Sequence, residues 1–273
     1  MNQYFQAIWQ QILQTLDHDL PDWPQRIKAL GQIAACEKRQ NGTNWSDAEV
    51  MQALIWGQLS SSTKWERVSP HLPELGNILF DYDIDIIQNQ NENWISEEIY
   101  PWFTARKAGS TTLKASLNSL IPNSQKLVKL SQAFGNLENW LQSEFKQGGA
   151  KQIVRAIGSE NSPTKLKGFG IPLAAEAAKN LGFSIAKPDR HLNRMMACWQ
   201  AVSFKHWHNT SDFAAPEATE SELWRVIDIV ARCAEQIGES QVYVDNVLWL
   251  SAANEGLHLR NQDFAAMLSS AAN

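Results

Sequence analysis

The stretch Leu166-Lys167-Gly168-Phe169-Gly170-Ile171-Pro172-Leu173-Ala174-Ala175 places two glycines between a short helical segment and an alanine-rich one. Glycine adopts positive φ angles without steric cost, so Gly168 and Gly170 permit a tight turn between two helices. Such a turn directs backbone N–H groups outward at the start of the second helix, where the helix dipole adds positive potential. The stretch therefore predicts a helical hairpin that binds phosphate through its backbone.

Outward from this turn, apolar residues recur at helical spacing along most of the chain. The first helical face carries Tyr4, Ile8, Ile12 and Leu16, and similar periodicity covers residues 190–202, 220–237 and 242–253. Ser46-x-x-Glu49 fits a capping box at the start of another helix, which we expect to give way to a polar loop at residues 58–64. Only residues 84–87 favour a strand. The chain is therefore predicted to be all-α, without a Rossmann sheet or a barrel.

The composition is that of a globular protein: 44% of the 273 residues are hydrophobic and 19% are charged, which argues against disorder. No apolar run approaches the roughly 18 to 20 residues of a membrane-spanning helix, and the first 20 residues do not resemble a secretory signal. We therefore expect a cytoplasmic protein without a membrane partner. The three cysteines lack a CxxC spacing, which disfavours a disulfide framework, a cysteine zinc site and an iron–sulfur cluster.

Charge is distributed unevenly along the chain. The net charge is −5, yet residues 146–194 carry nine basic and three acidic residues, so the remainder holds −11. A basic segment in an acidic protein is suited to a phosphate-bearing partner, although a solvated basic surface explains it as well.

Three segments resemble one family of DNA-repair enzymes. Lys187-Pro188-Asp189-Arg190-His191-Leu192-Asn193-Arg194, which begins 17 residues after Gly170, resembles the Asp-Thr-His-x-x-Arg element of the helix-hairpin-helix, Gly/Pro-rich-loop, Asp (HhH-GPD) superfamily of DNA glycosylases. Residues 54–63 resemble the helix-to-loop segment of that family that enters DNA, and residues 103–113 its Lys-Ala helix. The chain is similar to the endonuclease III and 3-methyladenine DNA glycosylase branches, without the iron–sulfur cluster.

The resemblance implies an all-α fold of two helical lobes that flank a DNA-binding cleft. It implies an amino-terminal helical segment over 1–45, a glycosylase core over 46–253 and a carboxy-terminal tail over 254–273. The implied function is base excision repair: a damaged base is flipped out of double-stranded DNA and its N-glycosidic bond is hydrolysed with Asp189. The family's lysine nucleophile has no counterpart at Ile171, Pro172 and Leu173. The resemblance therefore implies a monofunctional enzyme, with Lys167 and Lys179 as phosphate or surface residues.

The resemblance also assigns contacts to individual residues. Gln58 is expected to fill the gap left by the flipped base, with Ser61 or Ser62 as the alternative. An alkylated purine is favoured because aromatic rings attract cationic bases, and an oxidised purine, a mismatch or another modified base is the alternative substrate. We expect a monomer, without a metal, that associates with the nucleoid when bound to DNA; a monovalent cation at the hairpin carbonyls would assist binding. The residues expected to contact DNA are Lys167, Gly168, Phe169, Gly170, Ile171, Arg190, His191 and Arg194, and those expected to line the base pocket are Trp56, Trp65, Trp102 and Trp199.

Alternatives remain open for several of these residues. An aspartate between a proline and a helix is most often an N-cap, a role that Asp189 can combine with catalysis. The four tryptophans can be core residues, and His191 can be a buried structural histidine. At the level of the whole protein, the alternatives are a noncatalytic DNA-binding protein and a related enzyme that acts on a modified base outside repair.

Overall fold

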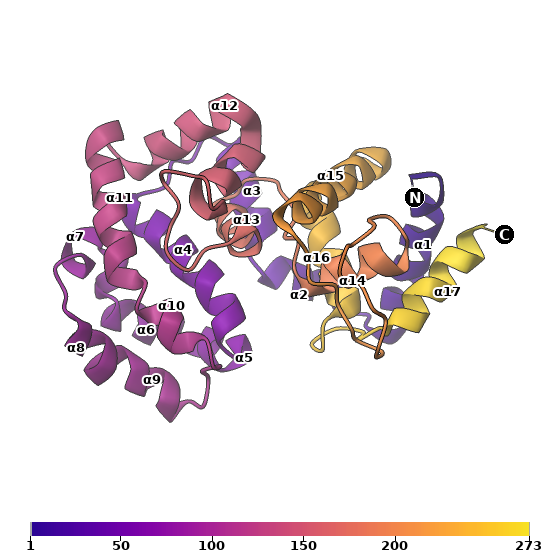
Figure 1. Cartoon of the computed structure of the whole chain (residues 1–273), viewed down its shortest axis with the longest axis horizontal. Helices are drawn as coiled ribbons and strands as arrows, with labels where there is room; N and C mark the ends of the chain where they lie inside the picture. Colours follow the sequence, from indigo (N-terminus) through magenta and orange to yellow (C-terminus); the bar gives the residue numbers. More distant parts are fainter. Residues whose placement is uncertain (1, 273) are drawn as a thin grey trace. The chain divides into compact units, whose positions relative to one another are not determined.

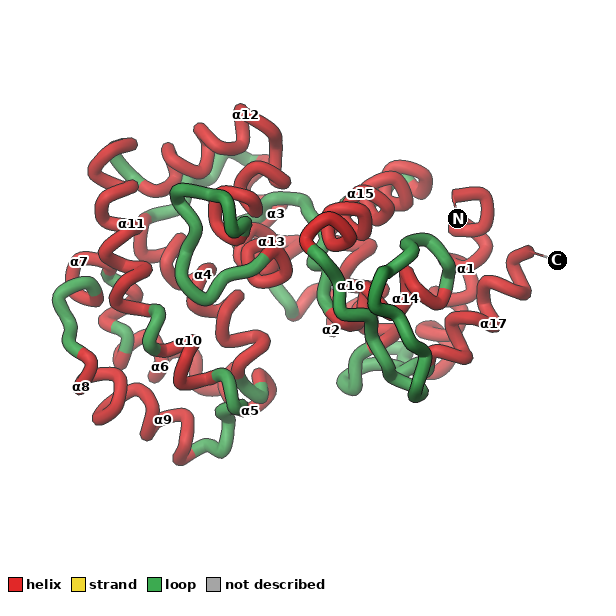
Figure 2. Tube along the Cα trace, viewed as in Figure 1, coloured by secondary structure: helices red, strands yellow, loops and turns green. Residues whose placement is uncertain are grey.

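A computed structural model describes residues 2–272 of the chain, in which helices are joined by loops and no β-strand occurs (Figures 1 and 2). The only bridges in these residues are the isolated pairs Thr63–Gly109 and His206–Glu217. The prediction of an all-α protein is confirmed. The strand predicted at residues 84–87 is wrong, because Asp83 caps the short helix α7 (Ile84–Ile87) by accepting hydrogen bonds from its first N–H groups. No helix within 2–272 is long and apolar enough to cross a membrane.

The described residues form two compact units, which we call unit 1 (2–38 and 182–272) and unit 2 (39–181). The boundary therefore falls inside the core predicted over 46–253. The amino-terminal segment predicted over 1–45 and the tail predicted over 254–273 are likewise not separate parts: residues 2–38 and 254–272 both belong to unit 1.

Unit 2 contains both helices that flank the predicted hairpin, α12 (Leu137–Gly158) before it and α13 (Ile171–Asn180) after it. The helix α3 (Gln32–Gln40) runs from unit 1 into unit 2. The elements that follow are α4 (Asp47–Ser62), α5 (Trp65–Val68), η1 (Ser69–His71), α6 (Leu72–Ile78), η2 (Phe80–Tyr82), α7, α8 (Glu92–Trp94), η3 (Ile95–Ile99), α9 (Tyr100–Ala105), α10 (Leu113–Leu117), α11 (Leu120–Phe134), α12 and α13.

Helix α4 is the centre of unit 2, since it contacts α10, α11, α12 and α13. Its start is the predicted capping box: the Ser46 hydroxyl accepts from the Glu49 N–H at 3.2 Å, and the Glu49 carboxylate accepts from the Ser46 N–H at 2.8 Å. The polar loop expected from residue 58 is wrong, because α4 continues to Ser62. Gly57 permits the close approach of α13, since a Cβ at this position would lie 3.1 Å from the Ala177 nitrogen.

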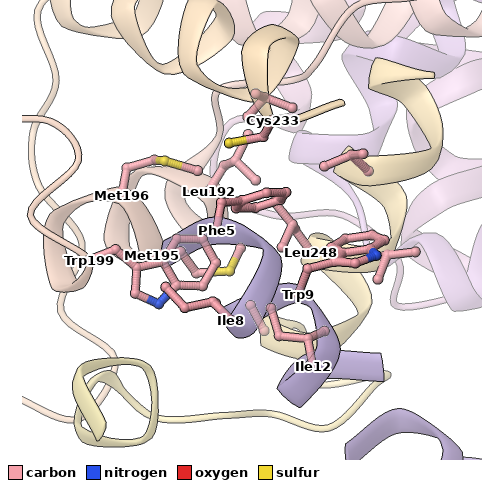
Figure 3. Packing of buried hydrophobic residues seen from close by; sticks show 14 of the residues in the cluster. Phe5, Ile8, Trp9, Ile12, Leu192, Met195, Met196, Trp199, Cys233 and Leu248 are labelled. Atoms are coloured by element: carbon pink, nitrogen blue, oxygen red, sulfur yellow. The ribbon is translucent and has the colours of Figure 1, made fainter. Parts of the chain in front are cut away.

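Unit 1 is built around the predicted apolar face of α1 (Asn2–Asp19), on which Ile8, Ile12 and Leu16 are fully buried. This face packs with Leu192, Met195 and other apolar residues into one core (Figure 3). The unit's other helices are α2 (Trp23–Ala29), α14 (Arg190–Cys198), α15 (Glu220–Ile237), α16 (Gln241–Ala252) and α17 (Asn261–Ala272). Contacts of α1 with α15, α16 and α17 join the two ends of the chain in a single unit.

We expect Ile8→Ala to lower the free energy of unfolding by about 2 to 5 kcal/mol, because it removes a fully buried side chain from this core. Urea denaturation followed by circular dichroism measures the change. Gln10→Ala, at an exposed position of the same helix, is the matched control and should leave stability within about 0.5 kcal/mol. Equal stability of the two variants would contradict the assignment of α1 to the core of unit 1.

Candidate nucleic-acid interface

The predicted turn lies between α12 and α13 in unit 2. Gly168 has a φ of +79°, and Gly170 is the extended N-cap residue of α13. The first backbone bond of α13 runs from the Ala174 N–H to the Gly170 carbonyl at 3.0 Å. Within residues 2–272, the N–H groups of Gly168, Gly170 and Ile171 have no hydrogen-bond acceptor. The segment therefore presents three backbone donors at the positive end of a helix dipole, the arrangement that suits an anion.

The packing of the two helices depends on glycine at the end of α12. A Cβ on Gly158 would lie 2.8 Å from both the Ala174 Cβ and the Gly170 carbonyl oxygen, so a side chain at this position would force the helices apart. The Leu166 N–H also donates to the Ile157 carbonyl at 2.9 Å, which ties the turn back to α12. Lys179, expected at the surface of α13, is instead only 3% exposed, and its ammonium lies 3.9 Å from the Glu176 carboxylate.

Two buried amide side chains, Asn123 and Gln58, pack against the turn inside unit 2. Asn123 on α11 donates through Nδ2 to the Lys167 carbonyl at 3.0 Å and accepts through Oδ1 from the Lys167 N–H at 2.7 Å. Gln58 on α4 donates through Nε2 to the Ser119 hydroxyl at 2.7 Å, and a Cβ on Gly168 would lie 2.6 Å from this nitrogen. No local motif surrounds Asn123, so the sequence did not indicate its role at the turn.

The intercalating role expected for Gln58 is wrong, since its side chain is 3% exposed and is hydrogen-bonded inside unit 2. Ser61, one of the two alternatives, is exposed in the last turn of α4. The end of this helix is fixed to the segment with the Lys-Ala resemblance: the Lys64 N–H donates to the Ala108 carbonyl at 2.6 Å, and the Ser110 N–H to the Ser62 carbonyl at 2.9 Å. Two segments singled out in the sequence are thus adjacent.

Asp189 lies in unit 1 as the N-cap residue of α14, so the N-cap interpretation is confirmed. Its Oδ1 atom accepts from the His191 N–H at 2.8 Å and from the Leu192 N–H at 3.1 Å. Within residues 2–272, the second oxygen, Oδ2, accepts no hydrogen bond, and the side chain is half-buried. A carboxylate held in this way keeps a fixed orientation and one oxygen for another partner.

His191 is half-buried beside this carboxylate. Burial lowers the pKa of its imidazole, Asp189 opposes this effect by attraction, and Arg190 and Arg194 lower the pKa further. The ring atom Nδ1 is buried and has no partner within the described part of the chain, and Nε2 accepts from the Arg190 Nε at 3.3 Å. The neutral imidazole is therefore the favoured form at neutral pH. Arg190 itself is exposed, so it can contact an external phosphate.

Arg194, expected to contact DNA, is instead a structural residue of unit 1. It is 2% exposed, and its guanidinium donates to the Asn261 side chain at 3.1 Å and to the carbonyls of Ala252 at 2.9 Å and Leu259 at 2.7 Å. Ala252 is the last residue of α16, where the negative end of the helix dipole favours a cation. The DNA-contact role predicted for Arg194 is wrong, because its donors are used within the unit.

The four tryptophans do not share one site. In unit 2, Trp56 and Trp65 form an edge-to-face pair with ring centroids 6.0 Å apart, and Trp56 Nε1 donates to the Tyr82 hydroxyl at 3.1 Å. Also in unit 2, Trp102 is 9% exposed and has the Arg106 guanidinium 4.0 Å from its ring centroid. Trp199 lies in the core of unit 1, 1% exposed (Figure 3). Its predicted role in a base pocket is wrong, since it is covered by core residues.

No protein-family model, no curated protein and no solved structure matches this chain. The described residues also contain no group of three or more His, Cys, Asp or Glu side chains placed to hold a metal ion.

We expect Arg194→Gln to lower the free energy of unfolding by at least about 2 kcal/mol, because the buried carbonyls of Ala252 and Leu259 lose their donor. Arg190→Gln, at an exposed position in the same helix, should change it by less than about 0.5 kcal/mol. Thermal and urea denaturation test both. An unchanged stability of Arg194→Gln would restore this residue as a candidate for external contacts.

Acid should destabilise unit 1 through His191. In the unfolded chain a histidine takes up a proton near about pH 6.5, but burial makes the folded chain take it up only at lower pH. Acidification below about pH 6.5 therefore favours the unfolded state. His191→Gln should reduce the loss of unfolding free energy between about pH 7.5 and about pH 5. His208→Gln, at an exposed histidine of unit 1, is the control; an equal reduction in both variants would refute this assignment.

Proposed function

We propose that the chain is a monofunctional DNA glycosylase that hydrolyses the N-glycosidic bond of a damaged base. The observation that carries the proposal is the turn between α12 and α13, with the unpaired N–H groups of Gly168, Gly170 and Ile171 at the start of a helix. We assign it as a helix-hairpin-helix motif that binds a DNA phosphate. The exposed Lys167 beside it adds positive charge, and the DNA-binding cleft expected from the sequence belongs to the same proposal.

Asp189 is the proposed catalytic residue. Cleavage of the bond between base and deoxyribose builds positive charge on the sugar, which an ionised carboxylate stabilises. The α14 N–H groups of His191 and Leu192 orient one carboxylate oxygen, which leaves Oδ2 to face the sugar or to accept a proton from the attacking water. The cap and the chemistry thus use different oxygens of one side chain, so the N-cap role is compatible with catalysis.

The absence of a lyase step rests on Ile171, Pro172 and Leu173, which occupy the place of the lysine nucleophile in the bifunctional branch. Lys179 is buried in α13, so it supplies no exposed amine after the hairpin. Strand cleavage by Schiff-base chemistry requires such an amine. The proposed product is therefore an intact strand with an abasic site.

Base extrusion requires a side chain that fills the space left in the duplex. With Gln58 buried, Ser61 is the proposed residue at this position, beside the segment Arg106-Lys107-Ala108. The proposed substrate class is an alkylated purine, since Trp56 and Trp65 form a pair of aromatic rings in unit 2 that would attract a cationic base. A monovalent cation at the hairpin carbonyls belongs to the proposal as an aid to phosphate binding.

We expect Asp189→Asn to abolish base release and to retain DNA affinity. Asparagine caps a helix as well as aspartate does, so this change removes the charge and keeps the cap. Release of free base is measured on duplexes that carry N-alkylpurines, 8-oxoguanine, uracil or hypoxanthine, with alkali added afterwards to reveal abasic sites. Strand cleavage that needs alkali supports the monofunctional assignment, whereas cleavage without alkali contradicts it.

The matched control is Asp83→Asn, because Asp83 caps α7 in the same way, accepting from the Asp85 and Ile86 N–H groups at 2.8 and 3.1 Å. This variant should release base at the wild-type rate. If wild-type protein binds duplex DNA and releases no base from any lesion, the noncatalytic DNA-binding protein becomes the better assignment. The cap geometry of Asp189 is compatible with that alternative as well, since a structural role alone accounts for it.

A further inference from the structure

A recess of about 400 Å³ lies beside the hairpin in unit 2, and Lys167 and Gly168 of the hairpin form part of its wall. It is formed by the first turns of α11 and by the chain that enters the turn. Its lining residues are Pro122, Asn123, Lys126, Lys165, Leu166, Lys167 and Gly168. Three of these seven residues are lysines and none is acidic, so the recess is a basic surface.

The three lysines differ in whether an acidic side chain neutralises their charge. Lys165 forms an ion pair with Glu160, which lies outside the recess. Lys126 donates to the Lys165 carbonyl at 2.7 Å and to the Pro163 carbonyl at 3.5 Å, neutral partners that orient its ammonium and leave its charge uncompensated. Lys167 is exposed and has no ion-pair partner within residues 2–272. Two positive charges are therefore available to a ligand.

The dipole of helix α11 adds to the positive potential of the recess, and hydrogen bonds of Asn123 hold its wall in place. The 15-residue helix α11 begins at Leu120, so the recess lies at the positive end of its dipole. Asn123, 5% exposed, holds both the N–H and the carbonyl of Lys167 and thereby fixes the position of the wall. Because the side chain of Lys126 is already oriented, binding an anion costs less conformational entropy than at a free lysine.

We propose that this recess binds a phosphate group, as a second anion site next to the hairpin. The volume exceeds that of a phosphate alone and admits the phosphate together with part of a nucleotide. The ligand is the phosphodiester of a DNA strand or a free phosphate, and the first source rests on the proposed function. The charge and the geometry of the recess are independent of catalysis at Asp189.

The test of the DNA source is Lys126→Gln, because Lys126 lines the recess and has no part in the proposed hairpin contacts. Glutamine keeps a donor for the Lys165 carbonyl and removes the charge. We expect the slope of log affinity against log salt concentration for duplex DNA to fall by about 0.9, the contribution of one phosphate contact. Lys129→Gln, exposed on the same helix and outside the recess, should leave the slope unchanged. Circular dichroism verifies that both variants are folded.

The free-phosphate arm uses titration of the wild-type protein and of Lys126→Gln with sodium phosphate, followed by the amide resonances of Gly168 and the side-chain amide of Asn123. If the amide resonances of the wild-type protein shift saturably with phosphate, Lys126→Gln abolishes the shifts, and the salt slopes of the wild-type protein and Lys126→Gln are equal, the recess binds free phosphate. Equal salt slopes together with no Lys126-dependent shift overturn the proposal. Neither readout involves base release, and the phosphate titration decides the recess even if the wild-type protein binds no DNA, which would defeat only the proposed function.

Discussion

The close approach of α12 and α13 is the constraint on which the candidate DNA contact depends. The space beside Gly158 is closed by Ala174 and by the Gly170 carbonyl, and Gly57 gives α4 a similar approach to Ala177. Dense packing restricts how neighbouring helices can be placed, since close-packed side chains have few alternative arrangements. The start of α13 is therefore fixed relative to two helices of unit 2, and the donors of the turn point in a direction that the packing sets.

Buried polar side chains complete what the glycines permit. A turn that leaves its own N–H groups unpaired lacks the backbone bonds that stabilise a helix or a sheet, so it needs support from elsewhere. The Asn123 side chain makes two hydrogen bonds with the Lys167 backbone. The Gln58 side chain, bonded to Ser119, occupies the space next to Gly168. The unpaired N–H groups of the turn and the buried amides that support it depend on each other, because the turn needs side-chain support to keep its backbone donors available to a ligand.

Local sequence patterns predicted the parts of the fold that local physics decides. The capping box at Ser46 and the apolar face of α1 follow from neighbouring residues, and both occur as expected. The division between residues 181 and 182 follows from packing of α1 with helices more than 200 residues away, which no periodicity reveals. The residue types of Gln58 and Arg194 indicated that both can form hydrogen bonds, but the sequence did not determine whether they are buried. Both were therefore predicted to contact DNA, whereas in the structure each is hydrogen-bonded inside its own unit.

Burial also changes the meaning of the basic segment. The excess of positive charge over residues 146–194 includes Arg194 and Lys179, which are buried, and Lys165, which is paired with Glu160. These side chains contribute little to attraction at the surface, because a long-range field is weakened where opposite charge or buried dipoles offset it. Lys126 lies outside that segment, yet the fold brings it beside Lys167 in one recess. The proposed phosphate-bearing partner would therefore be attracted by charges that the fold brings together from α11 and the hairpin, more than by a run of basic residues in the sequence.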